Sequence, residues 1–269
     1  MPIPHDYHMH SDFSCDCKFP MAEMCRSAVE NSIPEIGFTE HYDLHPGETC
    51  RDWFKLEAWA AELERCRQTF AGRLIIRAGI EIGEPHIYQT EAQAMLQRYP
   101  FDYVLGSLHW VGPETIFDPN YFRSRTADEA FRQFFEELEA VTRVGGFDIL
   151  SHFDVPVRTA SEVYGPQAYD PCNYEDCIRP VLKNCIERGI ALDINTKGLR
   201  SKCNVLTPGL DILRWYVEMG GERITLGSDS HQPKFVGADC EVAMDTARSA
   251  GLKYVMQFEK RDARFVKIL

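Results

Sequence analysis

Two histidines near the start of the chain have the spacing of a metal site. His8 and His10 are separated by one residue, and in an extended strand the side chains two positions apart point to the same face. Neutral imidazole is the commonest protein ligand for zinc, and it also binds iron and nickel. For a lone His-x-His pair, solvated side chains would be the better interpretation. The prediction of a metal site therefore depends on whether other segments supply partners.

Short apolar segments elsewhere in the chain end in further candidate ligands. Such segments are typical of buried strands, and the polar residues at their ends are Glu40 with His41, Glu81, His109, His152, and Asp229 with His231. Potential ligands recur in the same position of successive segments. We therefore predict one metal site that is assembled from the ends of several strands.

Composition restricts the class of protein. The chain has 269 residues, a hydrophobic fraction of 44% and a formal net charge of −12. This length suits one large α/β domain, and we expect residues 1–269 to form a single domain. The acidic charge disfavours a nucleic-acid partner, which usually binds a basic stripe. There is neither an apolar run of roughly 18 residues, as a membrane span needs, nor a signal peptide, so we expect a cytoplasmic protein.

Ten cysteines are scattered along the chain. Intracellular thiols usually stay reduced, and a buried cysteine behaves as a small apolar residue. Cys15 and Cys17 flank Asp16, but no second close pair completes a tetrahedral zinc site. We therefore expect the cysteines to be structural.

Strand-like and helix-like segments alternate along the chain. The strands are predicted near 4–10, 35–39, 74–82, 102–108, 147–151, 190–195 and 223–228, each followed by a helix. Ligands from the carboxyl ends of many strands converge only if the strands encircle one point. The pattern thus favours a closed or nearly closed barrel over a doubly wound open sheet. Residues 153–173 are predicted to form a long active-site loop.

The motifs resemble those of the PHP (polymerase and histidinol phosphatase) superfamily. They are His8-Met-His10-Ser, Asp16, Thr39-Glu-His41, Gly79-Ile-Glu81, Gly106-Ser-Leu-His109, Ser151-His152-Phe-Asp154 and Gly227-Ser-Asp-Ser-His231, in the order of the family. Within the superfamily the chain resembles the monofunctional histidinol-phosphate phosphatases. The resemblance implies a distorted (β/α)7 TIM-like barrel, in agreement with the seven units counted above.

The resemblance also implies three divalent metal ions that share nine ligands. The first ion would be held by His8, His10, Glu81 and Asp229, the second by Glu81, His109 and His152, and the third by Asp16, His41 and His231. Some branches of the superfamily have a histidine in place of Asp16. A carboxylate makes that site harder and favours manganese or iron over zinc, so the choice among these three metals stays open.

The implied activity is hydrolysis of a small phosphomonoester, with L-histidinol phosphate of histidine biosynthesis as the leading substrate. Clustered divalent ions neutralise phosphoryl oxygens and lower the pKa of a bridging water, so a metal-bridging hydroxide would attack phosphorus. The expected catalytic residues are Glu81, Asp229 and His231. Glu40 is a further candidate, beside Asp229 and His231, for the proton donor to the leaving oxygen.

Three cations are candidates for the phosphate site, because cationic side chains pair with phosphate and arginine binds it bidentately. Lys197 and Arg200 lie just beyond the strand at 190–195, and Arg158 follows His152. We expect them at the mouth of the barrel, with Arg200 the foremost phosphate ligand. The cationic end of the substrate requires an acidic group, for which Asp118 or Glu114 is the candidate.

Three alternative functions fit parts of the pattern. A PHP phosphoesterase could act on nucleotides, other small phosphates or phosphotyrosine. Amidohydrolase-type barrels also begin with His-x-His, but the fourth strand here ends in His109 and offers no lysine that could be carboxylated. A non-catalytic metal-binding or polymerase-accessory module is disfavoured, because no appended polymerase or basic region is present.

Overall fold

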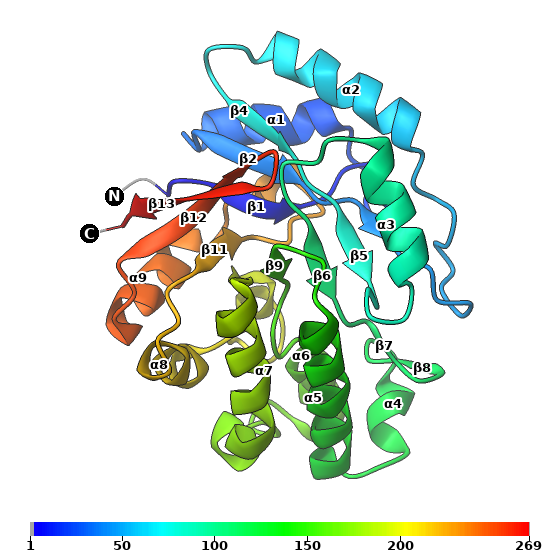
Figure 1. Cartoon of the computed structure of the whole chain (residues 1–269), viewed down its shortest axis with the longest axis vertical. Coiled ribbons are helices and arrows are strands. Elements are labelled where there is room, and N and C mark those ends of the chain that lie inside the picture. The colour runs from blue at the N-terminus through cyan, green and yellow to red at the C-terminus, as the bar shows by residue number, and fades with distance from the viewer. Residues whose placement is uncertain (1–2, 269) are drawn as a thin grey trace.

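The computed structural model describes residues 3–268, and its centre is a set of parallel strands surrounded by helices (Figure 1). One sheet has the order β1-β2-β4, with bounds Asp6–Met9, Glu35–Phe38 and Ile75–Ala78. The other has the order β11-β10-β9-β6-β5-β3, with bounds Ile224–Gly227, Ala191–Asn195, Ile149–Leu150, Leu105–Ser107, Glu81–Gly83 and His41–Tyr42. All pairings within these two sheets are parallel.

The two sheets join into a distorted ring. β3 follows β2 after two residues, and β5 follows β4 in the same way. The ring is completed by a parallel bridge between Met9 and Ser230, where the main-chain N–H of His10 donates to the carbonyl of Ser230 at 2.9 Å. Residues 3–268 thus contain seven strand positions around one axis, as predicted for the (β/α)7 TIM-like barrel.

The helices cover the outside of the ring because each has one apolar face. The long ones are α1 (Met21–Glu30), α2 (Leu56–Thr69), α3 (Gln89–Arg98), α5 (Ala127–Val144), α7 (Glu175–Arg188), α8 (Leu210–Glu218) and α9 (Cys240–Ala250). α5 begins at a capping box of Thr126 and Glu129, and α7 ends at Gly189 with φ 70°. None of the helices between residues 3 and 268 has the length and apolarity that crossing a membrane demands.

A C-terminal hairpin, which the sequence analysis did not predict, fills one end of the ring. β12 (Tyr254–Glu259) pairs antiparallel with β13 (Asp262–Lys267), and it lies across β1 and β11 in Figure 1. Met256 and Phe258 are buried in a small apolar cluster with Tyr7 and Leu105. Leu105 lies two residues before Ser107 of the polar site, on the same strand face. The hairpin therefore packs inside the ring, below the level of Ser107.

Several smaller elements also differ from expectation. The predicted active-site loop at 153–173 contains α6 (Val157–Tyr164) and the short helix η1 (Pro171–Tyr174). The chain after β6 forms the hairpin β7–β8 (Trp110–Val111 and Glu114–Thr115) and α4 (Pro119–Arg123). The remaining short helices are η2 (Lys197–Arg200) and η3 (Pro233–Phe235).

Two of the cysteines, which the sequence analysis expected to be structural, are joined to each other. Cys15 and Cys50 form a disulfide with their Cα atoms 5.7 Å apart, and the other eight cysteines are free. The loop after β1 and the loop after β3 meet at this point, although 35 residues separate the two cysteines in the chain.

Candidate metal centre

The nine predicted ligands lie within the strands or in the loops that follow them, and Asp16 is in the loop after β1. Four groups of their donor atoms are each mutually within 4.8 Å: His8, His10 and Asp229; His8, Glu81 and His152; His41, Glu81 and His109; and His10, His41 and His231. The ninth residue, Asp16, has its Oδ2 atom 2.7 Å from Nε2 of His231. The strands therefore bring together residues that are spread over more than two hundred positions of sequence.

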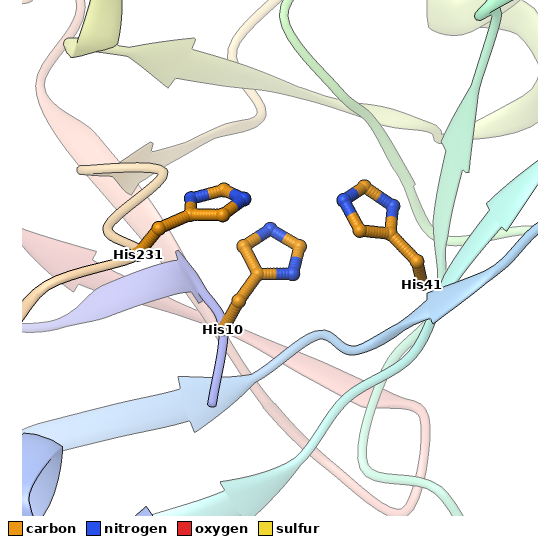
Figure 2. Close-up of side chains that lie close together, drawn as sticks. All are labelled: His10, His41 and His231. Carbon is orange, nitrogen blue, oxygen red and sulfur yellow. The ribbon is translucent and has the colours of Figure 1, made fainter. Parts of the chain in front are cut away.

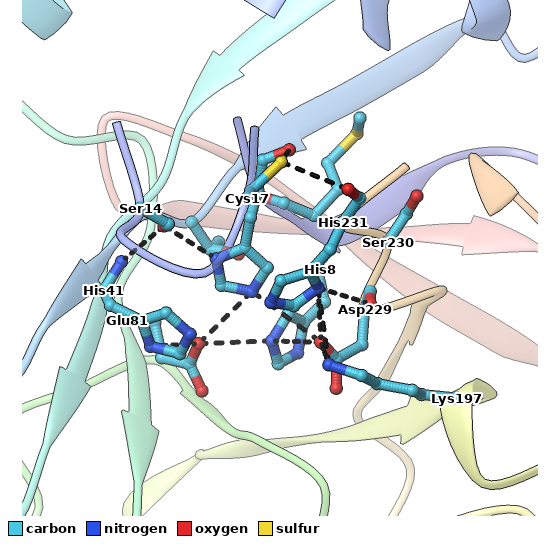
Figure 3. A network of polar contacts seen from close by, with 12 residues as sticks. His8, Ser14, Cys17, His41, Glu81, Lys197, Asp229, Ser230 and His231 are labelled. Atoms are coloured by element: carbon cyan, nitrogen blue, oxygen red, sulfur yellow. Dashed lines mark hydrogen bonds and ion pairs between the residues drawn. The ribbon is translucent and has the colours of Figure 1, made fainter. Parts of the chain in front are cut away.

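The carboxylate of Glu81 contacts several imidazoles of this cluster, and Figure 3 draws such contacts as dashed lines. The Oε2 atom of Glu81 is 3.3 Å from Nε2 of His8 and 3.5 Å from Nε2 of His10, and Oδ1 of Asp229 is 4.0 Å and 3.8 Å from the same nitrogens. Its other oxygen, Oε1, is 3.2 Å from Nε2 of His152 and 3.4 Å from Nε2 of His109. One carboxylate thus faces two separate groups of imidazoles.

The third group lies nearer the surface. The imidazoles of His10, His41 and His231 come from three different segments and face one another across a small space (Figure 2). Asp16 is half-exposed, and its Oδ2 atom is 3.7 Å from Nε2 of His41. The carboxylate of Asp16 therefore lies on the solvent side of this group, next to His41 and His231.

A divalent cation would suit these donors. Nε2 of His8, Nε2 of His10 and Oε2 of Glu81 are buried, yet they have no hydrogen-bond partner within residues 3–268. Buried polar atoms are nearly always paired, so three unpaired acceptors that face one point indicate a ligand. Imidazole and carboxylate together match the preferences of zinc, iron and manganese.

Two aspartates that the sequence analysis overlooked orient the imidazoles. Oδ2 of Asp193 is 2.9 Å from Nδ1 of His8, and Oδ1 of Asp43 is 3.2 Å from Nδ1 of His109. Oδ2 of Asp43 also lies 3.3 Å from Nδ1 of His41. A carboxylate that accepts the Nδ1–H of an imidazole leaves Nε2 free to bind a metal and makes it more basic.

Glu40 has a similar supporting role beside His10. Both of its oxygens accept hydrogen bonds, from the hydroxyl and main-chain N–H of Ser11 and from the hydroxyl of Ser14. Ser14 in turn lies 3.0 Å from Nδ1 of His10. Burial raises the pKa of Glu40 to about 7, although the serine hydrogen bonds oppose this shift. The carboxyl group therefore orients His10 through Ser14.

The surroundings keep the two central carboxylates ionised. Burial disfavours the charged form of Glu81, but the imidazoles of His8 and His41 hold its pKa well below the usual range. Burial also disfavours the charged form of Asp229. The positive charge of Lys197 is the strongest of the opposing effects, which together hold the pKa of Asp229 well below its usual range. Both groups are thus available as anionic ligands.

Two of the predicted phosphate ligands reach the site. Nζ of Lys197 is 2.9 Å from Oδ1 of Asp229, and Nη1 of Arg158 is 3.1 Å from Oδ2 of the same carboxylate. Figure 3 shows the Lys197 side chain extending to Asp229 beside His231. Both cations line a small pocket of about 150 Å³ together with the ligand residues Glu81 and His152.

The other predicted substrate contacts are not at this pocket. Arg200 pairs with Asp239 at 2.9 Å and donates to the carbonyl of Ser228, so its guanidinium is occupied in joining η2 to the loops after β11. Asp118 is exposed and caps α4 by accepting from the main-chain N–H of Asn120 at 2.8 Å. Glu114 pairs with Arg125. Arg158 and Lys197 line the small pocket and Arg200 does not, and the expectation that Arg200 is the foremost phosphate ligand stays a prediction.

A second, larger cleft adjoins the first. It has a volume of about 360 Å³ and shares Asp16, His41, His109 and Phe117 with the small pocket. Its outer wall includes Trp110, and an acidic residue of the loop after β3, Glu48. We call this larger cleft the side chamber. The site thus consists of a small polar pocket at the candidate metal ligands and the side chamber next to it.

Comparison with known proteins gives matches along nearly the whole chain. A family model described as the PHP domain matches residues 6–197. A probable histidinol-phosphatase of Clostridium acetobutylicum is 31% identical over 95% of this chain and 97% of its own length. A histidinol-phosphatase of Lactococcus lactis is 27% identical over 94% of this chain and 93% of its own length.

A solved structure has the same fold. The crystal structure of histidinol phosphate phosphatase from Lactococcus lactis, in complex with zinc, L-histidinol and phosphate, superposes with a TM-score of 0.87. It is 25% identical to this chain, and the match covers 97% of this chain and 98% of the other.

Proposed function

Because the chain belongs to the PHP domain family, we propose that it is a metal-dependent phosphatase that hydrolyses L-histidinol phosphate to L-histidinol and phosphate. The observation that carries this proposal is the set of unpaired donor atoms of His8, His10 and Glu81 beside the cations Arg158 and Lys197. A metal centre next to two cations, which share the carboxylate of Asp229, suits a dianionic phosphate ester. The similar Lactococcus lactis enzyme was crystallised with the two products of this reaction.

The nine ligands would hold three divalent ions. His8, His10, Glu81 and Asp229 would bind the first, and Glu81, His109 and His152 the second, since the two oxygens of Glu81 face these two groups. Asp16, His41 and His231 would bind the third. When bound, divalent ions neutralise phosphoryl oxygens and make a water nucleophilic near neutral pH.

Side chains of this protein would supply the remaining parts of the reaction. Arg158 and Lys197 would bind the phosphoryl oxygens, in place of part of their present contact with Asp229. Of the three candidate proton donors, Glu40 is occupied by Ser11 and Ser14. Asp229 and His231 therefore remain the candidates to protonate the leaving oxygen.

The experiment that tests this function is phosphate release from a panel of small phosphomonoesters. The chelator-treated protein is reconstituted with manganese, iron or zinc and given histidinol phosphate, a nucleoside monophosphate, phosphotyrosine and 4-nitrophenyl phosphate. We expect histidinol phosphate to have the highest kcat/KM, with activity only after reconstitution. Equal activity before and after metal removal, or a preference for a nucleotide or phosphotyrosine, would overturn the proposal.

A further inference from the structure

The side chamber next to the metal centre has the chemistry of a site for the alcohol half of the substrate. It shares four residues with the small pocket, so an ester whose phosphate lies in the small pocket can extend its leaving group into the chamber. The ring of Phe117 lies 5.4 Å from that of His109, and Trp110 stacks on His45 with ring centroids 4.0 Å apart. These rings provide flat apolar walls against which an imidazole can pack.

One carboxylate in the chamber, Glu48, has no cationic partner among residues 3–268. Asp43 is engaged by His41 and His109, as described above. The partners of Glu48 in residues 3–268 are neutral: its Oε2 atom accepts from Nε1 of Trp110 at 3.3 Å, and its Oε1 atom accepts from the main-chain N–H of Cys50 at 3.2 Å and from the hydroxyl of Thr49 at 3.3 Å. Glu48 is half-buried, so a cation that pairs with it would be partly shielded from water.

The segment that carries Glu48 is joined to the rest of the molecule by the disulfide and by the stacking of His45 on Trp110. Residues 43–55 contain neither helix nor strand, and their main-chain hydrogen bonds are local turns, such as Glu48 N–H to His45 at 2.9 Å and Trp53 N–H to Cys50 at 3.0 Å. Cys50 lies two residues after Glu48, and its partner Cys15 lies directly before the ligand Asp16. One covalent bond thus joins the acid of the chamber to the ligand loop of the metal centre.

We infer that Glu48 is a specificity-determining residue that binds the cationic end of the leaving alcohol, and that the Cys15–Cys50 disulfide is the positioning element that holds Glu48 in the chamber. The inference rests on the proposed function, since it concerns the alcohol released from the phosphate ester. Glu48 takes the place that the sequence analysis gave to Asp118 or Glu114. The ligand class is an amino alcohol with an ammonium or imidazolium group.

The test compares a cationic with an uncharged leaving group. Glu48→Gln removes the charge and keeps the shape, and Cys15→Ser/Cys50→Ser removes the disulfide and keeps Glu48. Asp52→Asn is the matched control, because Asp52 is an exposed acid of the same loop outside the chamber. We expect Glu48→Gln to lower kcat/KM for histidinol phosphate relative to 4-nitrophenyl phosphate by about tenfold, mainly through KM, as befits a lost charge-assisted contact. Asp52→Asn leaves this ratio unchanged.

Two further measurements separate positioning from general stability. Calorimetric binding of L-histidinol in the absence of turnover should weaken about tenfold in Glu48→Gln and severalfold in the double serine variant. Combining the three substitutions should add no further loss to that of Glu48→Gln, because the disulfide acts through Glu48. Thiol titration of the denatured wild type, purified without reductant, should give eight thiols of the ten cysteines.

The outcomes distinguish this inference from the proposed function. If the wild type prefers histidinol phosphate and Glu48→Gln keeps that preference, the inference is wrong and the function stands. If the double serine variant loses activity equally on both substrates, or if ten thiols are titrated, the disulfide has no positioning role. If the wild type shows no preference for the cationic ester, both the function and the inference are overturned.

Discussion

The substitution Asp193→Asn changes the charge behind one imidazole of the metal centre while keeping the shape of the side chain. Asp193 is 1% exposed, and its Oδ2 atom lies 2.9 Å from Nδ1 of His8. The same oxygen accepts from Nδ2 of Asn195 at 3.2 Å. An asparagine fits this space but is a much weaker acceptor, so it would lower the basicity of Nε2 of His8. We therefore expect weaker metal binding in a folded protein.

The size of the effect follows from the contact. Removing the carboxylate that supports a metal-binding histidine typically lowers metal affinity by about 10- to 100-fold. This range corresponds to roughly 1.4–2.8 kcal/mol, which agrees with the roughly 1.5–3 kcal/mol of a hydrogen bond to a charged group. Only the ion bound by His8 should be affected to this extent.

The assay is metal content after dialysis against graded chelator concentrations, with circular dichroism to monitor the fold. The matched control is Asp148→Asn, because Asp148 is a half-buried aspartate that pairs with Arg261 before β9, away from the ligands. We expect the control to hold its metal as the wild type does. If Asp193→Asn retains every ion at the same chelator concentrations as the wild type, the orienting role of Asp193 is refuted.

Three further predictions concern other parts of the molecule. Glu81→Gln should nearly abolish turnover and lower the metal content while the circular dichroism stays native; full metal occupancy with normal turnover would exclude a bridging carboxylate. Arg158→Ala should lower kcat/KM by about 10- to 100-fold, because it loses a phosphate contact of roughly 1.5–3 kcal/mol. Arg200→Ala should lower Tm and leave KM unchanged. If instead Arg200→Ala lowers kcat/KM and Arg158→Ala does not, Arg200 is the phosphate ligand. Burial lowers the pKa of His5 from 6.5 to about 3, so the unfolded chain binds a proton at this residue before the folded chain does as pH falls. Between about pH 7.5 and pH 5, the free energy of unfolding should therefore drop by roughly 2 kcal/mol more in the wild type than in His5→Gln. Glutamine can still accept from the main-chain N–H of Leu226, and equal pH slopes in urea unfolding would contradict this prediction.

The strand count and the clustering of the candidate ligands could be predicted because their signals are local. Each strand is a short apolar segment, and each ligand is a distinctive polar residue at its end, as Glu81 and His109 illustrate. Asp193 also left a local signal, since a charged residue lies inside the buried strand Ala191–Asn195. A buried carboxylate in a strand requires a partner, and that argument could have placed it beside the histidines.

Other features depend on contacts that no local pattern reveals. Arg200 follows a strand at the mouth of the barrel, but its guanidinium turns toward Asp239, whose position is set by α9. The C-terminal hairpin turns at Lys260 and Arg261, both with positive φ, although such turns usually contain asparagine or glycine. The usual hairpin signal was therefore absent.

Anomalous diffraction from crystals of the metal-loaded protein is the decisive test of the three-ion centre, because it locates each ion independently of activity. We predict three peaks within the nine ligands, with the carboxylate of Glu81 contacting two of them and His41 bound to the third. Two ions bridged by a modified lysine, or a site at His41 that stays empty when the other ligands are saturated, would contradict the account.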